Sequence, residues 1–259
     1  MPEPCFETLV TEKADGITTV YLNRPEKRNA MNQLMFEELK SAFEYIRDDT
    51  GTSVCVITGK GKAFSAGLDL SALDMFTSVD ATTFRVLVRR LQNVYRLLET
   101  MEKPIIAMVN GPALGAGMEL VLACDFVLAA TTANFGLLEV KYGLVTDLGS
   151  TQRLPRIVGT LRAKELIMTG KIIDAQEAEK IGMVNSVHPP DQLEEEARKL
   201  AETLKALPQP AVGLCKIAID KSHGNSIDSG LEYEIQSQTI CFNKLVEMMK
   251  SSKPAQTEG

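Results

Sequence analysis

Two apolar runs in the first half of the chain constrain its fold most strongly. Residues 53–59 (SVCVITG) and 103–109 (KPIIAMV) are short and almost continuously apolar. Such runs are consistent with strands that are covered on both faces, as in a parallel sheet. Residues 16–22 and 126–131 predict further strands, and apolar residues recur at helical spacing in residues 32–49. This alternation of strands and helices predicts an α/β fold.

The second half of the sequence is mostly helical. Three further helices are predicted over residues 191–207, 210–222 and 227–250. No linker of low complexity divides the chain, but its composition shifts near residue 200. We therefore predict a core over residues 1–200 and a helical C-terminal region over residues 201–259.

The charge balance disfavours a nucleic-acid partner. The chain has 28 basic and 34 acidic residues and a formal net charge of −6. The predicted helix over residues 33–49 carries Lys40 and Arg47 against five acidic residues, so it offers no basic surface for RNA. No stretch of about 18 apolar residues is present, and the first residues lack the pattern of a signal peptide. We expect neither a membrane span nor a secretory signal.

Cysteine and histidine usage indicates a reducing compartment and no metal site. The five cysteines are widely spaced, and Cys55, Cys124 and Cys215 lie in apolar segments. We expect reduced, buried thiols and a cytoplasmic protein. The two histidines, His188 and His223, have no Cys or His neighbour at the spacing of a zinc site, so no metal ligand is predicted.

Residues 110–120 (NGPALGAGMEL) combine small residues with the expected start of a helix. Gly115, Ala116 and Gly117 have little or no side chain, so a ligand could approach their backbone N–H groups. Such donors can hold a developing oxyanion, and the glycine-containing loop over residues 63–70 could supply a second donor to the same oxygen. The spacing matches neither the dinucleotide-binding nor the P-loop pattern. Close helix packing is the alternative explanation for each turn taken alone.

Two carboxylates, Glu139 and Asp147, interrupt the mostly apolar stretch over residues 136–155. A carboxylate in apolar surroundings is costly unless it is paired or neutral. We therefore consider these two residues candidates for acid–base chemistry. Alternatively, Asp147 pairs with a cation such as Arg153 or caps the helix that begins near Gly149.

At this point the sequence resembles the crotonase superfamily, the enoyl-CoA hydratase/isomerase family. The resemblance extends over roughly residues 8–220 and is carried, in order, by LNRPEKRNAMN, GKAFSAGLDLSAL, KPIIAMVNGPALGAGMELVLACDFVLAATTANFGLLEVKYGL and TQRLPRIVGTLRAKELIMTGKIIDAQEAEKIGMVNSV. It implies a crotonase-like spiral of β-β-α units and an acyl-CoA thioester substrate. It further implies a helical tail that mediates assembly, commonly into homotrimers or dimers of trimers, and a reaction without metal or redox cofactor.

The resemblance also assigns binding residues. It places the oxyanion hole at the backbone N–H groups of Leu68 and Ala116. Arg24, Lys27 and Arg28 suit the phosphate groups of coenzyme A. Alternatively, these cations belong to a solvated loop that binds no ligand. Residues 73–84 are expected to border the acyl pocket. The residues expected to contact coenzyme A are Arg24, Lys27, Arg28, Ala66, Asp69 and Leu70.

The catalytic carboxylates favour one reaction but leave another open. Enoyl-CoA hydratases carry two glutamates that match Glu119 and Glu139, which predicts addition of water across the double bond of a 2-enoyl-CoA. Typical hydratases have glycine where this chain has Asp147. An acid there resembles dienoyl-CoA isomerases, in which residues matching Glu139 and Asp147 convert a 3,5-dienoyl-CoA to a 2,4-dienoyl-CoA. We expect three nearby carboxylates to raise one another's pKa.

We therefore predict a hydratase, with Glu119, Glu139 and Asp147 as catalytic residues. A dienoyl-CoA isomerase is the first alternative, and other reactions of the superfamily, such as hydrolysis or decarboxylation, come next. A non-catalytic RNA-binding or scaffold relative is the alternative outside catalysis.

Overall fold

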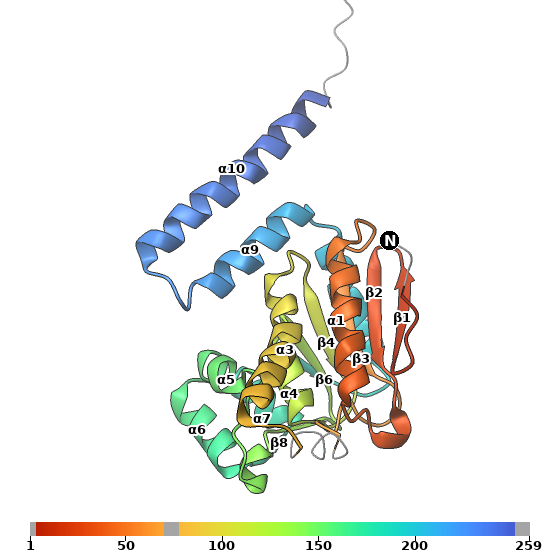
Figure 1. Ribbon diagram of the computed structural model, residues 1–259. Coiled ribbons are helices and arrows are strands. Elements are labelled where there is room, and N and C mark those ends of the chain that lie inside the picture. Colours follow the sequence, from red (N-terminus) through yellow and green to blue (C-terminus); the bar gives the residue numbers. More distant parts are fainter. Residues whose placement is uncertain (1–3, 70–77, 252–259) are drawn as a thin grey trace, which may run out of the picture.

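The computed structural model describes residues 4–69 and 78–251, and a six-stranded sheet lies at its centre (Figure 1). β1 pairs antiparallel with β2, and all other neighbouring strands of this sheet are parallel. The predicted strands near residues 16–22, 53–59, 103–109 and 126–131 are confirmed. In spatial order the strands are β1 (Leu9–Ala14), β2 (Ile17–Leu22), β3 (Val54–Gly59), β4 (Ile105–Val109), β6 (Phe126–Ala130) and β9 (Ser186–His188).

Side chains that alternate along the strands divide the core into two layers. β3 and β4 are buried at every residue. Cys55 and Ile57 belong to the same apolar cluster as residues of α1 and α3, whereas Val54 and Val56 pack with α8. Because helices cover both faces, the strands are apolar throughout. The covering helices are α1 (Gln33–Asp48), α3 (Ala81–Thr100) and α8 (Leu193–Lys205).

A second sheet of three strands, in the order β5-β7-β8, lies beside the first. After β4 the chain enters β5 and then α4, and after β6 it enters β7 and then η2. This repeated path agrees with the expected spiral of β-β-α units. The elements are β5 (Ala113–Leu114), α4 (Ala116–Val121), β7 (Asn134–Gly136), η2 (Glu139–Tyr142), α5 (Ser150–Val158), α6 (Thr160–Thr169), β8 (Ile172–Asp174) and α7 (Ala175–Lys180).

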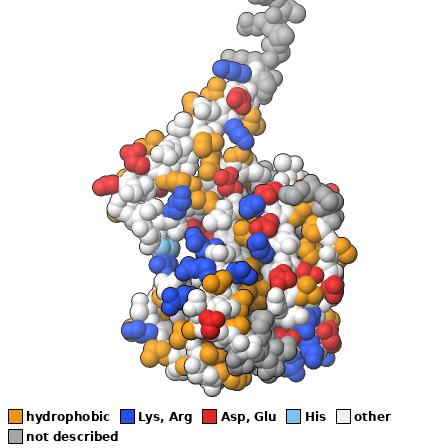
Figure 2. Space-filling view, viewed as in Figure 1, with side chains coloured by type: hydrophobic (Ala, Val, Ile, Leu, Met, Phe, Trp, Pro, Cys, Tyr) orange, Lys and Arg blue, Asp and Glu red, His pale blue; other side chains and the backbone are white. Residues whose placement is uncertain are grey.

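The C-terminal helices confirm the predicted helical segments. α8 packs on the main sheet, so the expected boundary at residue 200 falls within a helix that belongs to the core on both sides. α9 (Gln209–Lys221) follows, and α10 (Ile227–Ser251) extends away from the core (Figure 1). Figure 2 shows apolar side chains along α10, and Ile235, Phe242 and Leu245 are among its exposed residues. No helix in the described part of the chain is long and apolar enough to cross a membrane.

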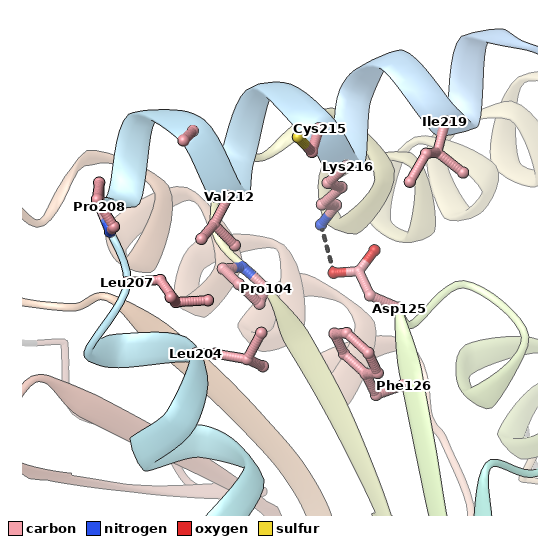
Figure 3. A pocket seen from close by; sticks show the side chains of 11 residues that line it. Pro104, Asp125, Phe126, Leu204, Leu207, Pro208, Val212, Cys215, Lys216 and Ile219 are labelled. Atoms are coloured by element: carbon pink, nitrogen blue, oxygen red, sulfur yellow. Dashed lines mark ion pairs between the residues drawn. The ribbon is translucent and has the colours of Figure 1, made fainter. Parts of the chain in front are cut away.

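A buried ion pair anchors α9 to the core (Figure 3). Lys216 Nζ lies 2.8 Å from Asp125 Oδ2 and donates to the backbone carbonyl oxygens of Leu98 and Lys103. The pair borders an apolar pocket of about 420 Å³ between α9 and the end of α8. Cys215 also lines this pocket but is exposed, so its predicted burial is wrong; Cys55 is buried, as predicted.

We predict that Lys216→Ala lowers the free energy of unfolding by about 3–5 kcal/mol, because it leaves Asp125 buried without its cation. Chemical denaturation measures this loss. Lys164→Ala removes an exposed lysine and serves as the control, with an expected change within about 0.5 kcal/mol. A similarly small loss for Lys216→Ala would contradict the anchoring role of the pair.

Candidate active site

Two loops at one end of the main sheet are joined by backbone hydrogen bonds. The first follows β2 and contains η1 (Pro25–Lys27); the second spans residues 63–69, after β3. Ala66 N donates to Arg28 O over 2.9 Å, and Met31 N donates to Gly67 O over 2.7 Å. The side chains of Arg24 and Asp69 add an ion pair of 2.7 Å between the same loops. The two loops therefore form one unit that fixes the backbone around Gly67.

Gly67 and Gly115 allow this unit to approach the turn between β5 and α4. Their φ angles are +95° and +49°, which strain any residue with a side chain. A Cβ atom at Gly67 would lie 2.8 Å from Leu114 O, and one at Gly115 would lie 3.0 Å from Glu139 Oε1. The two turns singled out in the sequence therefore lie against each other, with the Glu139 carboxyl beside them.

Each turn presents a backbone donor. Ala116 is the first residue of α4, and the first hydrogen bond within that helix runs from Glu119 N to Gly115 O. Within residues 4–69 and 78–251, neither Leu68 N–H nor Ala116 N–H donates a hydrogen bond. A donor at the N-terminal end of α4 and a second donor on the facing loop are suited to hold one oxyanion.

Glu119 is held firmly by one of its carboxylate oxygens. It is 1% exposed, and Oε1 accepts hydrogen bonds from Thr146 Oγ1 (2.8 Å), Leu148 N (3.0 Å), Ser150 N (3.1 Å) and Ser150 Oγ (2.7 Å). Burial raises the pKa of Glu119, and these donors oppose the rise because they stabilise the ionised form. All four donors come from the segment between η2 and α5 or from the first residue of α5.

Glu139, the first residue of η2, has a different environment. Its Oε2 is buried and has no hydrogen-bond partner in the part of the chain that the structure describes. Burial is the main cause that raises the pKa of Glu139 to about 7, and the nearby charges of Glu119 and Asp147 raise it further. This carboxyl can therefore carry a proton near neutral pH and give it up to a neighbouring atom.

In the described residues Asp147 neither pairs with Arg153 nor caps α5, which were the two structural roles considered as alternatives to catalysis. Arg153 instead bonds Glu99 Oε1 and Leu148 O, and the α5 N-cap is Gly149 without a side-chain bond. Burial, followed by the charge of Glu119, raises the pKa of the half-buried Asp147 to about 6. Asp147 therefore joins Glu119 and Glu139 in one group of interacting carboxyls, as predicted, although burial contributes more than mutual repulsion.

The residues expected to contact coenzyme A fall into three groups. Arg24 and Asp69 bond each other and join the two loops. Lys27, Arg28 and Ala66 are exposed on the surface of these loops. Leu70, together with residues 73–77 of the expected acyl-pocket border, lies outside the described residues.

Sequence reasoning missed three residues of the site. The hydroxyls of Thr146 and Ser150 bond Glu119 and each other. Tyr95, fully buried on α3, donates to Ala116 O over 2.8 Å and so fixes the peptide after the Ala116 donor. The two hydroxyl residues flank Asp147 in an apolar stretch, which was a usable signal; nothing in the sequence near Tyr95 pointed to this contact.

In the described residues no group of three His, Cys, Asp or Glu side chains could hold a metal ion. The arrangement offers paired backbone donors and two glutamate carboxyls with different hydrogen-bond environments. The apolar pocket beneath α9 includes none of these residues.

Known proteins place the chain in a family. A family model described as enoyl-CoA hydratase/isomerase matches residues 12–253. The crotonyl-CoA hydratase of Syntrophomonas wolfei is 40% identical over 238 residues, which cover 92% of this chain and 90% of that protein. The short-chain-enoyl-CoA hydratase of Clostridium acetobutylicum is 37% identical over 239 residues, with coverages of 92% and 90%. The crystal structure of an enoyl-CoA hydratase from Bacillus anthracis matches with a TM-score of 0.84 at 37% identity and covers 90% of each chain. The chain belongs to the enoyl-CoA hydratase/isomerase family.

Proposed function

We propose that the protein is an enoyl-CoA hydratase, an enzyme that adds water across the C2=C3 double bond of a 2-enoyl-CoA thioester. One observation carries the proposal: Glu119 and Glu139 lie beside the facing turns that present the N–H groups of Leu68 and Ala116, which donate no hydrogen bond within the described residues. The names of the relatives support the same reaction.

In this mechanism the thioester oxygen accepts hydrogen bonds from Leu68 N–H and Ala116 N–H. Polarisation of the carbonyl makes C3 electrophilic, and the donors stabilise the enolate that forms. Glu119 takes a proton from water as the water oxygen bonds to C3. Glu139 gives its proton to C2 as the enolate collapses. The two carboxyls exchange protonation states during the addition and are reset by proton transfer afterwards.

The remaining assignments complete the proposal. Lys27 and Arg28 are exposed cations beside the site and suit the phosphates of coenzyme A. The exposed apolar residues of α10 suit assembly into a homotrimer or a dimer of trimers, and we place the protein in the cytoplasm, in fatty-acid β-oxidation. Neither a cofactor nor a nucleic-acid partner is required by this chemistry.

Asp147 favours a second candidate function. It is half-buried, its side chain bonds no other residue in the described part of the chain, and its pKa of about 6 suits proton transfer. A dienoyl-CoA isomerase would use Glu139 at C2 and Asp147 at the far end of the conjugated system. Hydration remains the first proposal because Glu119, which it requires, is held in place by four donors.

Paired assays on the purified protein test the two functions. We predict fast loss of the enoyl thioester absorbance with short 2-enoyl-CoAs, and a fall in kcat of about 10²–10⁴-fold for Glu119→Gln and for Glu139→Gln. Asp147→Asn should retain hydration. Glu194→Gln, on the exposed side of α8, is the matched control and should match the wild type. Rapid formation of a 2,4-dienoyl chromophore from a 3,5-dienoyl-CoA, with negligible hydration, would overturn the first proposal in favour of the second.

The protonation of Glu139 also predicts a dependence of stability on pH. Its folded pKa of about 7 lies above its ordinary value of 4.5, so the folded state binds more protons between these values. Wild-type stability should therefore fall as pH rises from about 4.5 to about 7. Above this window Glu139→Gln should be more stable than the wild type by about 1–2 kcal/mol, a figure reduced for partial contact with solvent.

Unfolding by denaturant at several pH values measures this difference. The two proteins should converge below about pH 4.5, where Glu139 is protonated in both states. A Glu139→Gln variant that is less stable than the wild type throughout would show that the ionised carboxylate is favoured in the fold.

A further inference from the structure

Two hydroxyl groups converge on the same oxygen of Glu119. Thr146 Oγ1 and Ser150 Oγ lie 2.8 Å and 2.7 Å from Oε1 and also bond each other. Thr146 is 3% exposed, and Ser150 is fully buried. Buried hydroxyls need partners, and here the carboxylate is the partner of both.

This arrangement distinguishes the two oxygens of the carboxylate. Oε1 also accepts from the backbone N–H groups of Leu148 and Ser150, so four donors surround it. In the described residues no donor bonds Oε2, which is left to meet water or substrate. These donors lie 27 to 31 residues after Glu119 in the sequence, so their hydrogen bonds connect the start of α5 to α4.

We infer that Thr146 and Ser150 are positioning residues for Glu119, which hold Oε1 away from the reaction, aim Oε2 at the attacking water and keep the carboxylate ionised. The catalytic part of this inference rests on the proposed hydratase function. Because the two side chains act through Glu119, they need not touch the substrate.

The charges around Glu119 explain why hydroxyl donors matter. Among the described residues, the charge of Glu119 raises the pKa of Tyr95 of α3, Glu139 of η2 and Asp147 before α5. The cation that also acts on Tyr95 is Arg153 of α5, whose guanidinium bonds Glu99 Oε1 and Leu148 O. Arg153 is thus bonded to groups other than the Glu119 carboxylate. Burial favours the protonated form of Glu119, and the hydrogen bonds from Ser150, Thr146 and Leu148 oppose it.

The test combines Thr146→Val with Ser150→Ala, which removes both hydroxyls and keeps the backbone donors. We expect the apparent pKa on the acid side of the kcat/KM pH profile to rise by about one unit. The reason is that each lost hydrogen bond stabilises the ionised Glu119 carboxylate. At neutral pH kcat should fall about tenfold while KM changes little. Infrared titration of the Glu119 carboxyl, identified by the band that Glu119→Gln removes, should give the same upward shift without any substrate.

Two variants serve as controls. Thr18→Val breaks a buried pair of hydroxyls, Thr18 with Thr52 at 2.7 Å, that has no contact with Glu119, so it should leave the acid limb unchanged. Thr146→Ser keeps the hydroxyl, and its acid limb should lie closer to the wild type than that of Thr146→Val. If the double variant does not fold, the two single variants are measured instead, and each should show a smaller shift in the same direction.

The infrared and kinetic readouts separate the two proposals. An upward shift of the Glu119 midpoint supports the positioning role even in a protein that hydrates no enoyl-CoA, and that result would overturn only the proposed function. An unchanged midpoint in folded Thr146→Val and Ser150→Ala variants would overturn the positioning role, whatever the activity.

Discussion

The close approach of two backbone turns is the constraint on which the rest of the site depends. Gly67 and Gly115 come together because neither has a side chain, and Leu114 O leaves no room for a Cβ atom at Gly67. Hydrogen bonds between residues 28–31 and 66–69 hold the first turn, and β5 and α4 hold the second. The close backbone approach that these two glycines allow therefore places two N–H donors beside the Glu139 carboxyl.

The carboxyls derive their different properties from hydrogen bonding in a common apolar setting. Glu119 is the most buried of the three, yet it has four donors on one oxygen. Glu139 has a buried oxygen that no donor among the described residues reaches, and its pKa is raised to about 7. Similar side chains can thus hold a base and an acid at the same pH, which an addition of water to a double bond requires.

The sequence allowed the local structure and the charged residues of the site to be predicted, because these depend on nearby residues. Continuous apolar runs predicted β3 and β4, and small residues before a helix predicted the turn at Ala116. The family resemblance then supplied Glu119, which by itself is an ordinary helical glutamate. Contacts between distant segments could not be predicted: the bonds from Thr146 and Ser150 to Glu119, the bond from Tyr95 to Ala116, and the Arg24–Asp69 pair.

A crystal structure of the protein with a bound 3-hydroxyacyl-CoA would show directly whether the two turns hold the thioester oxygen. We expect the thioester oxygen to lie about 3 Å from both Leu68 N and Ala116 N, with the C3 hydroxyl next to Glu119 Oε2 and the C2 atom next to Glu139. A thioester whose oxygen points away from the two N–H groups, or an acyl-CoA that binds in the apolar pocket beneath α9, would contradict this arrangement.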